Sequence, residues 1–260
     1  MKANVKFSFG NNWESYAAQS LNAERVNQAR TDFAHLFEGI ALRDKTLLDI
    51  GFGQGLSLLL AAEAGARVLG IDVDAQCERA LRTTVIFFQL PLPPFEIVSI
   101  LDDAWVEAQY ARGGFDIVHS WGVLHHTGDM AHAFRNTARL VKSRGHLVIA
   151  IYNRHWTSSL WHLVKRVFVS SSPRIQRAMV RALELPMSVR VKMLNGGAAS
   201  GNRGMELHHD VRDWLGGYPY EYASRAEIEN EFAARHFRML KCLPAQGWTG
   251  CNQFVFAREE

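Results

Sequence analysis

The feature that most restricts the fold of this chain is an apolar stretch that runs into a glycine-rich turn at residues 48–55. The sequence there is Leu-Asp-Ile-Gly-Phe-Gly-Gln-Gly, and it predicts a strand over 46–50, a loop, and a helix from residue 56. Glycines in such a loop let the backbone turn sharply and approach a bound ligand closely. A second expected strand, 66–71, leads into Asp72, whose carboxylate can accept hydrogen bonds from ribose hydroxyls. Together these features predict a nucleoside cofactor at the carboxyl edge of a parallel sheet.

The spacing of the glycines distinguishes between cofactors. A dinucleotide-binding loop has its third glycine at the sixth position of the motif, but this chain has Leu56 there and a glycine one residue earlier. Asp49, just before the loop, would repel a pyrophosphate and suits a cation. The loop resembles motif I (D-x-G-x-G-x-G) of the class I methyltransferases, whose cofactor S-adenosyl-L-methionine carries a sulfonium and an ammonium. A nicotinamide-dependent oxidoreductase is the alternative that fits the alternation of strands and helices but not this spacing.

Strands and helices alternate through most of the chain, which predicts an α/β fold with a doubly wound, mostly parallel sheet. An ending of one helix and two strands would supply the antiparallel seventh strand that distinguishes methyltransferases of Rossmann-like fold from dehydrogenases. We expect a single domain over 1–260, with an N-terminal helical cap at 1–40. The expected strands are 46–50, 66–71, 95–100, 115–120, 146–152, 238–243 and 252–257, and the expected helices are 20–38, 56–64, 75–84, 103–111, 129–141 and 224–235.

A segment that this core does not need, residues 154–217, lies before the last two strands. Its part from 154 to 203 holds nine Lys or Arg and one acidic residue, Glu184. We expect this helical insert to form a lid over the substrate. A surface that docks on a membrane or a nucleic acid, and helices with merely solvated basic faces, are the alternatives. The apolar residues with roughly helical spacing are Trp156, Leu160, Trp161, Leu163, Val164 and Val167, flanked by Lys165 and Arg166.

The resemblance to class I methyltransferases covers most of the chain and implies a set of cofactor-binding residues. Asp72 would hold the ribose and Val73 would flank the adenine, while either Ser99 or Asp102 would contact the adenine amino group. Residues 7–13, 151–153 and 214–219 are similar to a bacterial subgroup that resembles the ubiquinone-biosynthesis O-methyltransferases. The implied cofactor-binding residues are Trp13, Asp49, Gly51, Phe52, Gly53, Gly55, Asp72, Val73, Ser99, Ile100, Asp102, Ser120 and Trp121.

Histidines are the candidate catalytic residues, since a methyl acceptor with a hydroxyl must lose a proton and imidazole titrates near neutrality. His126, which the resemblance aligns beside the transferring methyl, is the first candidate for a general base, with His125 next to it. His209 belongs to a second set, and its neighbours do not complete a metal site, so we expect no metal. Four aromatic side chains would form either a wall for a planar acceptor or ordinary core: Trp13, Trp121, Trp214 and Tyr218.

The composition limits the remaining possibilities. No apolar run approaches the ~20 residues that a membrane-spanning helix needs, and residues 1–5 lack the apolar core of a signal peptide. Three cysteines without zinc-site spacing favour free thiols, and we therefore expect a cytoplasmic protein. The net charge of +3 does not by itself indicate nucleic acid. We expect O-methylation of a small-molecule acceptor, with a tRNA or other nucleic-acid methyltransferase as the alternative.

Overall fold

The computed structural model describes residues 9–194, 207–245 and 250–259, and it contains one seven-stranded sheet. The strands are β1 (Thr46–Ile50), β2 (Arg67–Asp72), β3 (Phe95–Ile97), β4 (Phe115–Trp121), β5 (Val141–Tyr152), β6 (Phe237–Leu243) and β7 (Cys251–Arg258). Their order across the sheet is β3-β2-β1-β4-β5-β7-β6. All neighbours are parallel except β7, which runs antiparallel to both β5 and β6. The expected fold class is therefore confirmed, including the antiparallel seventh strand.

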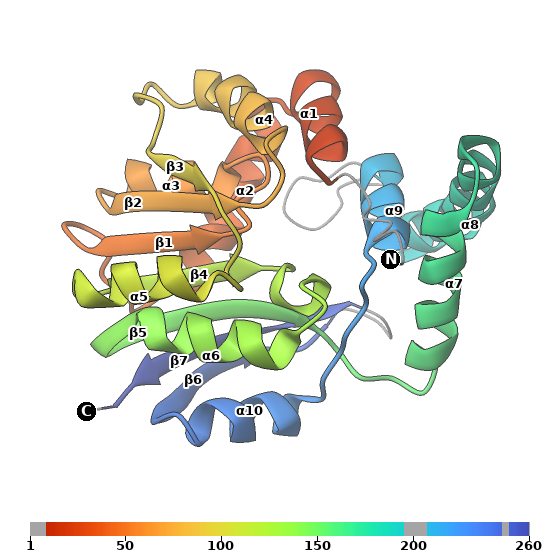
Figure 1. The fold of residues 1–260 in the computed structure, drawn as a ribbon. Helices are drawn as coiled ribbons and strands as arrows, with labels where there is room; N and C mark the ends of the chain where they lie inside the picture. Colours follow the sequence, from red (N-terminus) through yellow and green to blue (C-terminus); the bar gives the residue numbers. More distant parts are fainter. Residues whose placement is uncertain (1–8, 195–206, 246–249, 260) are drawn as a thin grey trace.

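Helices cover both faces of the sheet (Figure 1). They are α1 (Phe9–Gln19), α2 (Ala23–Leu36), α3 (Leu56–Glu63), α4 (Cys77–Thr84), α5 (Asp103–Ala111), α6 (Met130–Leu140), α7 (Ser158–Ser170), α8 (Pro173–Leu194), α9 (Leu207–Gly216) and α10 (Arg225–Ala233). Side chains alternate between the faces along a strand, so Leu48 and Ile50 pack in the cluster with α5, α6 and α10, whereas Leu47 packs in the one with α1 to α4. None of the described helices is long and apolar enough to cross a membrane.

The N-terminal region differs from the single helix expected over 20–38. The structure has two helices there, because the Asn22 side chain accepts a hydrogen bond from the backbone N–H of Arg25 and so starts α2 at Ala23. The preceding helix α1 has no counterpart in the expected elements. Its Gly10 N–H donates to the carboxylate of Asp74 at 2.9 Å, which fixes α1 beside the carboxyl end of β2. The strand expected over 146–152 also begins earlier, at Val141, where it pairs with Phe115.

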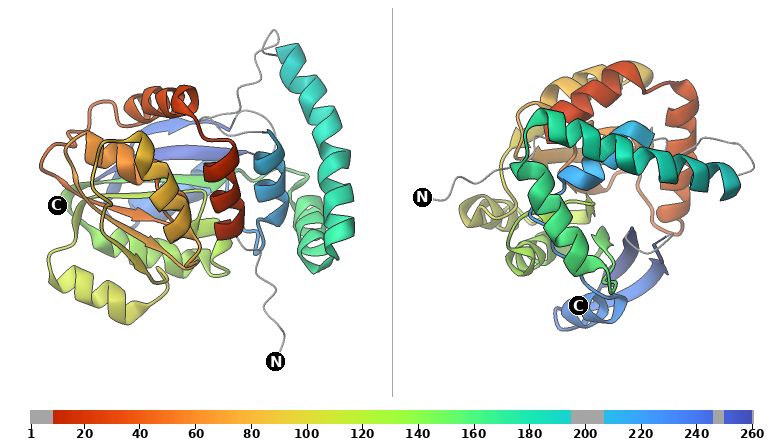
Figure 2. Two further views of the ribbon diagram at one scale, coloured as in Figure 1. Left: turned by 90° about the horizontal axis from the view of Figure 1, so that it is seen from above. Right: turned by 90° about the vertical axis from the view of Figure 1, so that its right-hand side faces the viewer.

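Helices α7, α8 and α9 lie between β5 and α10 in the chain and beyond the carboxyl edge of the sheet in space (Figures 1 and 2). They share a small apolar cluster of their own, formed by Phe168, Val169, Val180, Val211 and Leu215.

Helix α7 does not bury the whole apolar stripe seen in the sequence. Leu160 and Leu163 are each 57% exposed and Val167 is 46% exposed. On the opposite side of the helix, Lys165 is fully buried, together with Phe168. The helix therefore turns a lysine toward the body of the protein and leucines toward solvent.

Candidate cofactor and acceptor site

The loop after β1 has the backbone geometry that only glycine tolerates well. Gly51, Gly53 and Gly55 have φ values of +72°, +56° and +78°, and Gly55 is the left-handed residue that starts α3. A Cβ atom on Gly51 would lie 2.3 Å from a methyl carbon of Val123, and one on Gly53 would lie 3.0 Å from the indole nitrogen of Trp13. The loop is thus closely packed from above by α1 and by the segment after β4, with Phe52 buried beneath it.

Asp72 connects this loop to the end of β2. Its two carboxylate oxygens accept hydrogen bonds from the backbone N–H groups of Gly53 and Asp74, each at 3.0 Å. Burial raises the pKa of the Asp72 carboxyl, and the two amide hydrogen bonds act against that shift. Val73, expected to flank an adenine, is 60% exposed beside it. The expected ribose ligand and the expected glycine loop are therefore brought together, although they are 19 residues apart in the chain.

Asp49 is turned to the other side of the loop. Its Oδ1 accepts a hydrogen bond from Nδ1 of His119 at 2.6 Å, and both side chains are buried. His119 lies between the rings of Phe37 and Trp121, at centroid distances of 5.9 and 6.0 Å. Sequence reasoning missed His119, because nothing local in a strand indicates a partner 70 residues away. The Asp49 carboxylate therefore lies on the face of the sheet that α2 covers, where it pairs with His119.

The residues expected near the adenine form the turn after β3. Ser99 Oγ accepts a hydrogen bond from the backbone N–H of Leu101, and Ile100 is buried. Asp102 caps α5 by accepting from the N–H groups of Ala104 and Trp105, both at 3.1 Å. The backbone bond from Val98 N–H to Asp72 O, at 2.8 Å, places this turn next to the ribose candidate.

At the end of β4, Ser120 and Trp121 lead to the histidine pair in the short helix η2 (Leu124–His126). Ser120 Oγ donates to the carbonyl oxygen of Ile50 at 3.1 Å, which joins β4 to β1 just before the glycine loop. The histidines therefore follow the strand next to β1, on the carboxyl side of the sheet.

The two histidines have different partners. Nδ1 of His126 lies 2.6 Å from the carbonyl oxygen of Pro219, so this nitrogen donates and Nε2 is the acceptor in the neutral ring. Burial and the positive charge of Lys165 together lower the pKa of His126 to about 3, against the opposing effect of the hydrogen bond to Pro219. His125 is fully buried, and its Nδ1 accepts from the backbone N–H of Tyr152 at 3.4 Å. Burial lowers its pKa well below the ordinary value, and the neighbouring His126 and Lys165 act in the same direction.

The third histidine candidate, His209, belongs to α9, but its side chain lies outside the described residues.

Aromatic rings lie around His126. The rings of Phe9 and Tyr152 are 5.5 and 5.4 Å from it, and Tyr152 in turn is 5.1 Å from Tyr220. Trp214 and Tyr218, which the sequence places in a possible aromatic wall, pack against the insert cluster. Trp13 and Trp121 lie at the glycine loop and beside His119, so the four expected aromatic residues divide between two places.

Lys165 also contacts these aromatic residues. The sequence indicated only a charged residue beside an apolar stripe. Its ammonium lies 4.6 to 5.0 Å from the ring centroids of three aromatic residues and donates to the carbonyl oxygen of Trp214. A lysine that follows apolar residues and precedes an arginine carries no sequence signal for such burial. The three rings belong to Tyr152, Trp214 and Tyr220.

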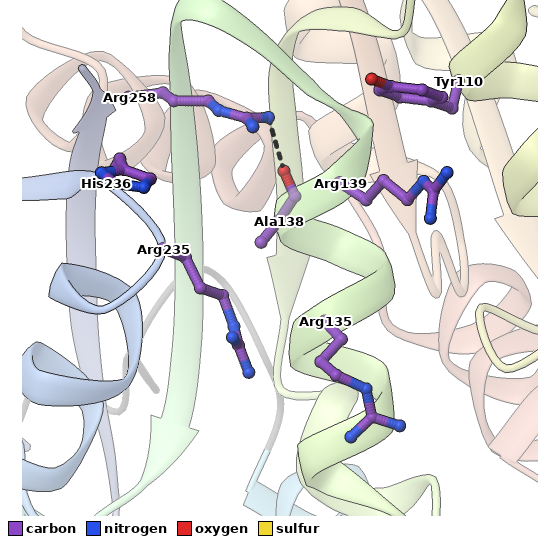
Figure 3. Close-up of a pocket in the computed structure, with 7 residues that line it drawn as sticks. All are labelled: Tyr110, Arg135, Ala138, Arg139, Arg235, His236 and Arg258. Carbon is purple, nitrogen blue, oxygen red and sulfur yellow. Dashed lines mark hydrogen bonds between the residues drawn. The ribbon is translucent and has the colours of Figure 1, made fainter. Parts of the chain in front are cut away.

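A cavity of about 330 Å³ lies elsewhere, between α6, α10 and the end of β7 (Figure 3). It contains none of the residues expected at the site. Four of its lining residues are arginines: two from α6, one from the turn after α10 and one from β7. Among the described residues there is also no group of three or more side chains suited to holding a metal ion. The cavity is lined by Tyr110, Arg135, Ala138, Arg139, Arg235, His236 and Arg258.

Comparisons with known proteins identify the family. A family model described as a methyltransferase domain matches residues 21–241. The chain belongs to this methyltransferase family. The family and the fold are those of S-adenosylmethionine-dependent methyltransferases, and neither supports the nicotinamide alternative.

Curated relatives of this methyltransferase include two ubiquinone biosynthesis O-methyltransferases. The protein from Serratia proteamaculans (strain 568) is 26% identical over 157 residues, which is 60% of this chain and 63% of the relative. The one from Rhodopseudomonas palustris (strain TIE-1) is 29% identical over 154 residues, which is 57% of this chain and 58% of the relative. The chain thus matches only about three fifths of the length of these relatives.

A solved structure of similar fold is the magnesium protoporphyrin IX methyltransferase from Synechocystis PCC 6803 with bound SAH. Its TM-score is 0.58 at 14% identity, with 96% of this chain and 93% of that chain covered. At this identity the likeness shows the fold alone.

Proposed function

We propose that this methyltransferase transfers the methyl group to a hydroxyl oxygen of a small molecule that binds beside His126. The observation that carries the proposal is the orientation of the imidazole. Because Nδ1 donates to Pro219, the nitrogen left to accept a proton is Nε2, held in one tautomer next to the strand that adjoins the cofactor loop. The names of the curated relatives also favour oxygen as the acceptor atom.

The residues present fit S-adenosylmethionine. The three left-handed glycines of the loop have no side chain that could block the approach of a ligand to the backbone. The Asp72 carboxylate beside the loop has lone pairs in addition to those that accept the two amide hydrogen bonds. Gly51, Gly53 and Gly55 would face the cofactor, Asp72 would hold the ribose, and Val73 would flank the adenine. When bound, the cofactor supplies a methyl group activated by a sulfonium.

The low pKa of His126 restricts the hydroxyl that it can serve. A base with a pKa of about 3 is neutral and ready to accept a proton at neutral pH, but it accepts one weakly. Such a base suits an acidic hydroxyl better than an aliphatic alcohol. Alignment of the oxygen with the methyl group supplies the rest of the catalysis.

Residues 154–217 would act as a lid and residues 1–40 as a cap over the cofactor. Lys165 of α7 is fully buried and its charge acts on His126, which supports a lid over the acceptor side. Phe9 and Trp13 of α1 reach His126 and the glycine loop, respectively. A covered acceptor site favours a small molecule over a polymer such as tRNA.

The test is transfer of label from labelled S-adenosylmethionine into a metabolite extract, followed by identification of the product by mass spectrometry. We expect one labelled small molecule with a new methoxy group, and labelled tRNA or an N-methyl product would overturn the proposal. His126→Ala should then lower turnover by roughly 10²- to 10⁴-fold and leave affinity for S-adenosylhomocysteine unchanged. His132→Ala, a histidine of α6 that pairs with Asp103, is the matched control.

A further inference from the structure

The side of α7 that faces solvent is apolar. Three of its residues follow one another at spacings of three and four, which puts them on one stripe of the helix, and Trp156 lies two residues before the helix begins. We call these four residues the outer face of α7. They are Trp156, Leu160, Leu163 and Val167, and they are 82%, 57%, 57% and 46% exposed.

Exposed apolar side chains are concentrated in this part of the surface. Among the described residues, ten large apolar side chains are exposed, and five of them belong to residues 156–175. The fifth is Ile175 of α8, which is 51% exposed. In the right-hand view of Figure 2, α7 and α8 face the viewer in front of the sheet. Single apolar residues on a surface are ordinary, whereas a group of them marks a surface that contacts another apolar phase.

The charge around the outer face is positive. Residues 155–183 contain five Lys or Arg and no Asp or Glu. Lys165 is buried, but the four arginines are exposed, and within the part of the chain that the structure describes none of the four forms an ion pair. An anionic surface would therefore be attracted to this side of the molecule. The four arginines are Arg166, Arg174, Arg177 and Arg181.

We propose that the outer face of α7 docks on an anionic lipid bilayer, with the apolar stripe in the interfacial region and the arginines at the lipid phosphates. The helix would lie in the plane of the membrane, because its 13 residues span only about 20 Å and cannot cross it. Tryptophan suits the boundary between water and acyl chains. Lys165 and Phe168, on the opposite side of α7, stay buried in the protein. The inference does not depend on the acceptor or the base proposed above.

Other occupants fit this face less well. A second copy of the chain would place the same arginines opposite one another across a two-fold axis, where like charges repel. A protein interface of ordinary size also needs about 20 residues on each side, many more than the five apolar residues present. A nucleic acid would pair with the arginines but would leave the leucines and Trp156 in water.

Sedimentation of the full chain with lipid vesicles tests the proposal. We expect binding to vesicles of equal parts phosphatidylcholine and phosphatidylglycerol, and much weaker binding to phosphatidylcholine alone. The double variant Leu160→Ser/Leu163→Ser should weaken binding to the anionic vesicles at least about 10-fold. The matched control is Ile86→Ser, in the short helix η1 (Val85–Phe87), which changes an apolar side chain that is 78% exposed and should leave binding unchanged. An unsubstituted protein that does not bind anionic vesicles, or a double variant that binds them equally well, would overturn the proposal.

The contributions of charge and of insertion are measured separately. Arg174→Gln should weaken binding to the anionic vesicles about 5-fold, whereas Arg112→Gln, which changes an exposed arginine at the end of α5, should have little effect. Vesicles with brominated acyl chains should quench tryptophan fluorescence, and Trp156→Phe should remove most of that quenching while the protein still sediments. Equal losses in the two arginine variants, or full quenching in Trp156→Phe, would place the docking surface elsewhere and contradict the proposal.

Two further measurements exclude loss of the fold and self-association. Affinity for S-adenosylhomocysteine in calorimetry should be unchanged in Leu160→Ser/Leu163→Ser, because both side chains are exposed. Sedimentation velocity without lipid should show no dimer that depends on these leucines. A concentration-dependent dimer that the double variant abolishes would assign the outer face to a second copy of the chain and overturn the proposal.

Discussion

Replacement of Asp72 by alanine tests the cofactor site most directly. In the structure this carboxylate accepts two backbone hydrogen bonds, from Gly53 and Asp74, and it would also accept the ribose hydroxyls. Loss of charge-assisted hydrogen bonds to the ribose should weaken S-adenosylhomocysteine binding by about 1.5–3 kcal/mol, which is roughly 10- to 150-fold in Kd. Isothermal titration calorimetry measures this change.

The same substitution should also destabilise the fold, because two partly buried amide groups lose their acceptor. At about 1 kcal/mol each, the free energy of unfolding should fall by about 2 kcal/mol, and Tm should fall by roughly 4–8 °C. Asp116→Ala is the matched control. That carboxylate also accepts from a backbone amide, of Thr46 at 2.8 Å, but it lies at the amino end of β4. We expect a similar loss of Tm and no change in affinity. Equal affinity losses in both variants, or none in Asp72→Ala, would refute the assignment of the ribose site.

Three further predictions concern the loop, acid stability and nucleic acid. Gly53→Ala should weaken S-adenosylhomocysteine binding at least about 10-fold, because its methyl group would meet the indole of Trp13 in α1. Gly39→Ala should lower only Tm, because this residue also has a positive φ but nothing within 4 Å of the added methyl group. Equal affinities of the two variants in calorimetry would contradict this prediction. Hydrogen bonds from residue 46 and Lys142 hold the pKa of Asp116 at about 2, below the ordinary 3.8, against the opposing effect of its burial. This carboxylate therefore contributes about 2 kcal/mol that is present above pH 4 and lost as the pH falls toward 2, and acid-unfolding curves of Asp116→Asn should lack that step. Bulk tRNA should not bind at low salt, because Lys165 is buried and Arg154 pairs with a glutamate; a gel shift that weakens steeply with salt would contradict this.

The sheet and its cofactor edge were predictable because their signals are local. The signals are apolar runs of strand length, glycines at fixed spacing and an acidic residue after the second strand. Each of them determines the backbone structure of only the few residues around it. The predicted β1, 46–50, and α5, 103–111, have the bounds that the structure shows. The predicted bounds are wrong where a capping side chain determines where a helix begins, as Asn22 does for α2.

Contacts between distant segments explain what the sequence could not reveal about the site. Asp49 was expected at the cofactor through its place in motif I, but its partner is a histidine in β4 that the motif does not include. The bond between Asp74 and Gly10 likewise spans 64 residues, and it holds α1 beside the carboxyl end of β2. The cofactor-binding assignments themselves stay predictions that the calorimetric experiments test.

The orientation of α7 shows why hydrophobic periodicity alone misplaces a lid helix. Periodicity assumes that the apolar face is the buried face, which holds when the helix packs on an apolar core. Here the surface under α7 includes the rings of Tyr152 and Tyr220, and aromatic faces stabilise a buried ammonium in a way that aliphatic side chains do not. Lys165 can therefore turn inward without the cost of an isolated buried charge, and the neighbouring positions Leu160 and Leu163 are carried outward by the geometry of the helix. The orientation of the charged and apolar side chains of α7 thus follows from the aromatic surface that the helix covers.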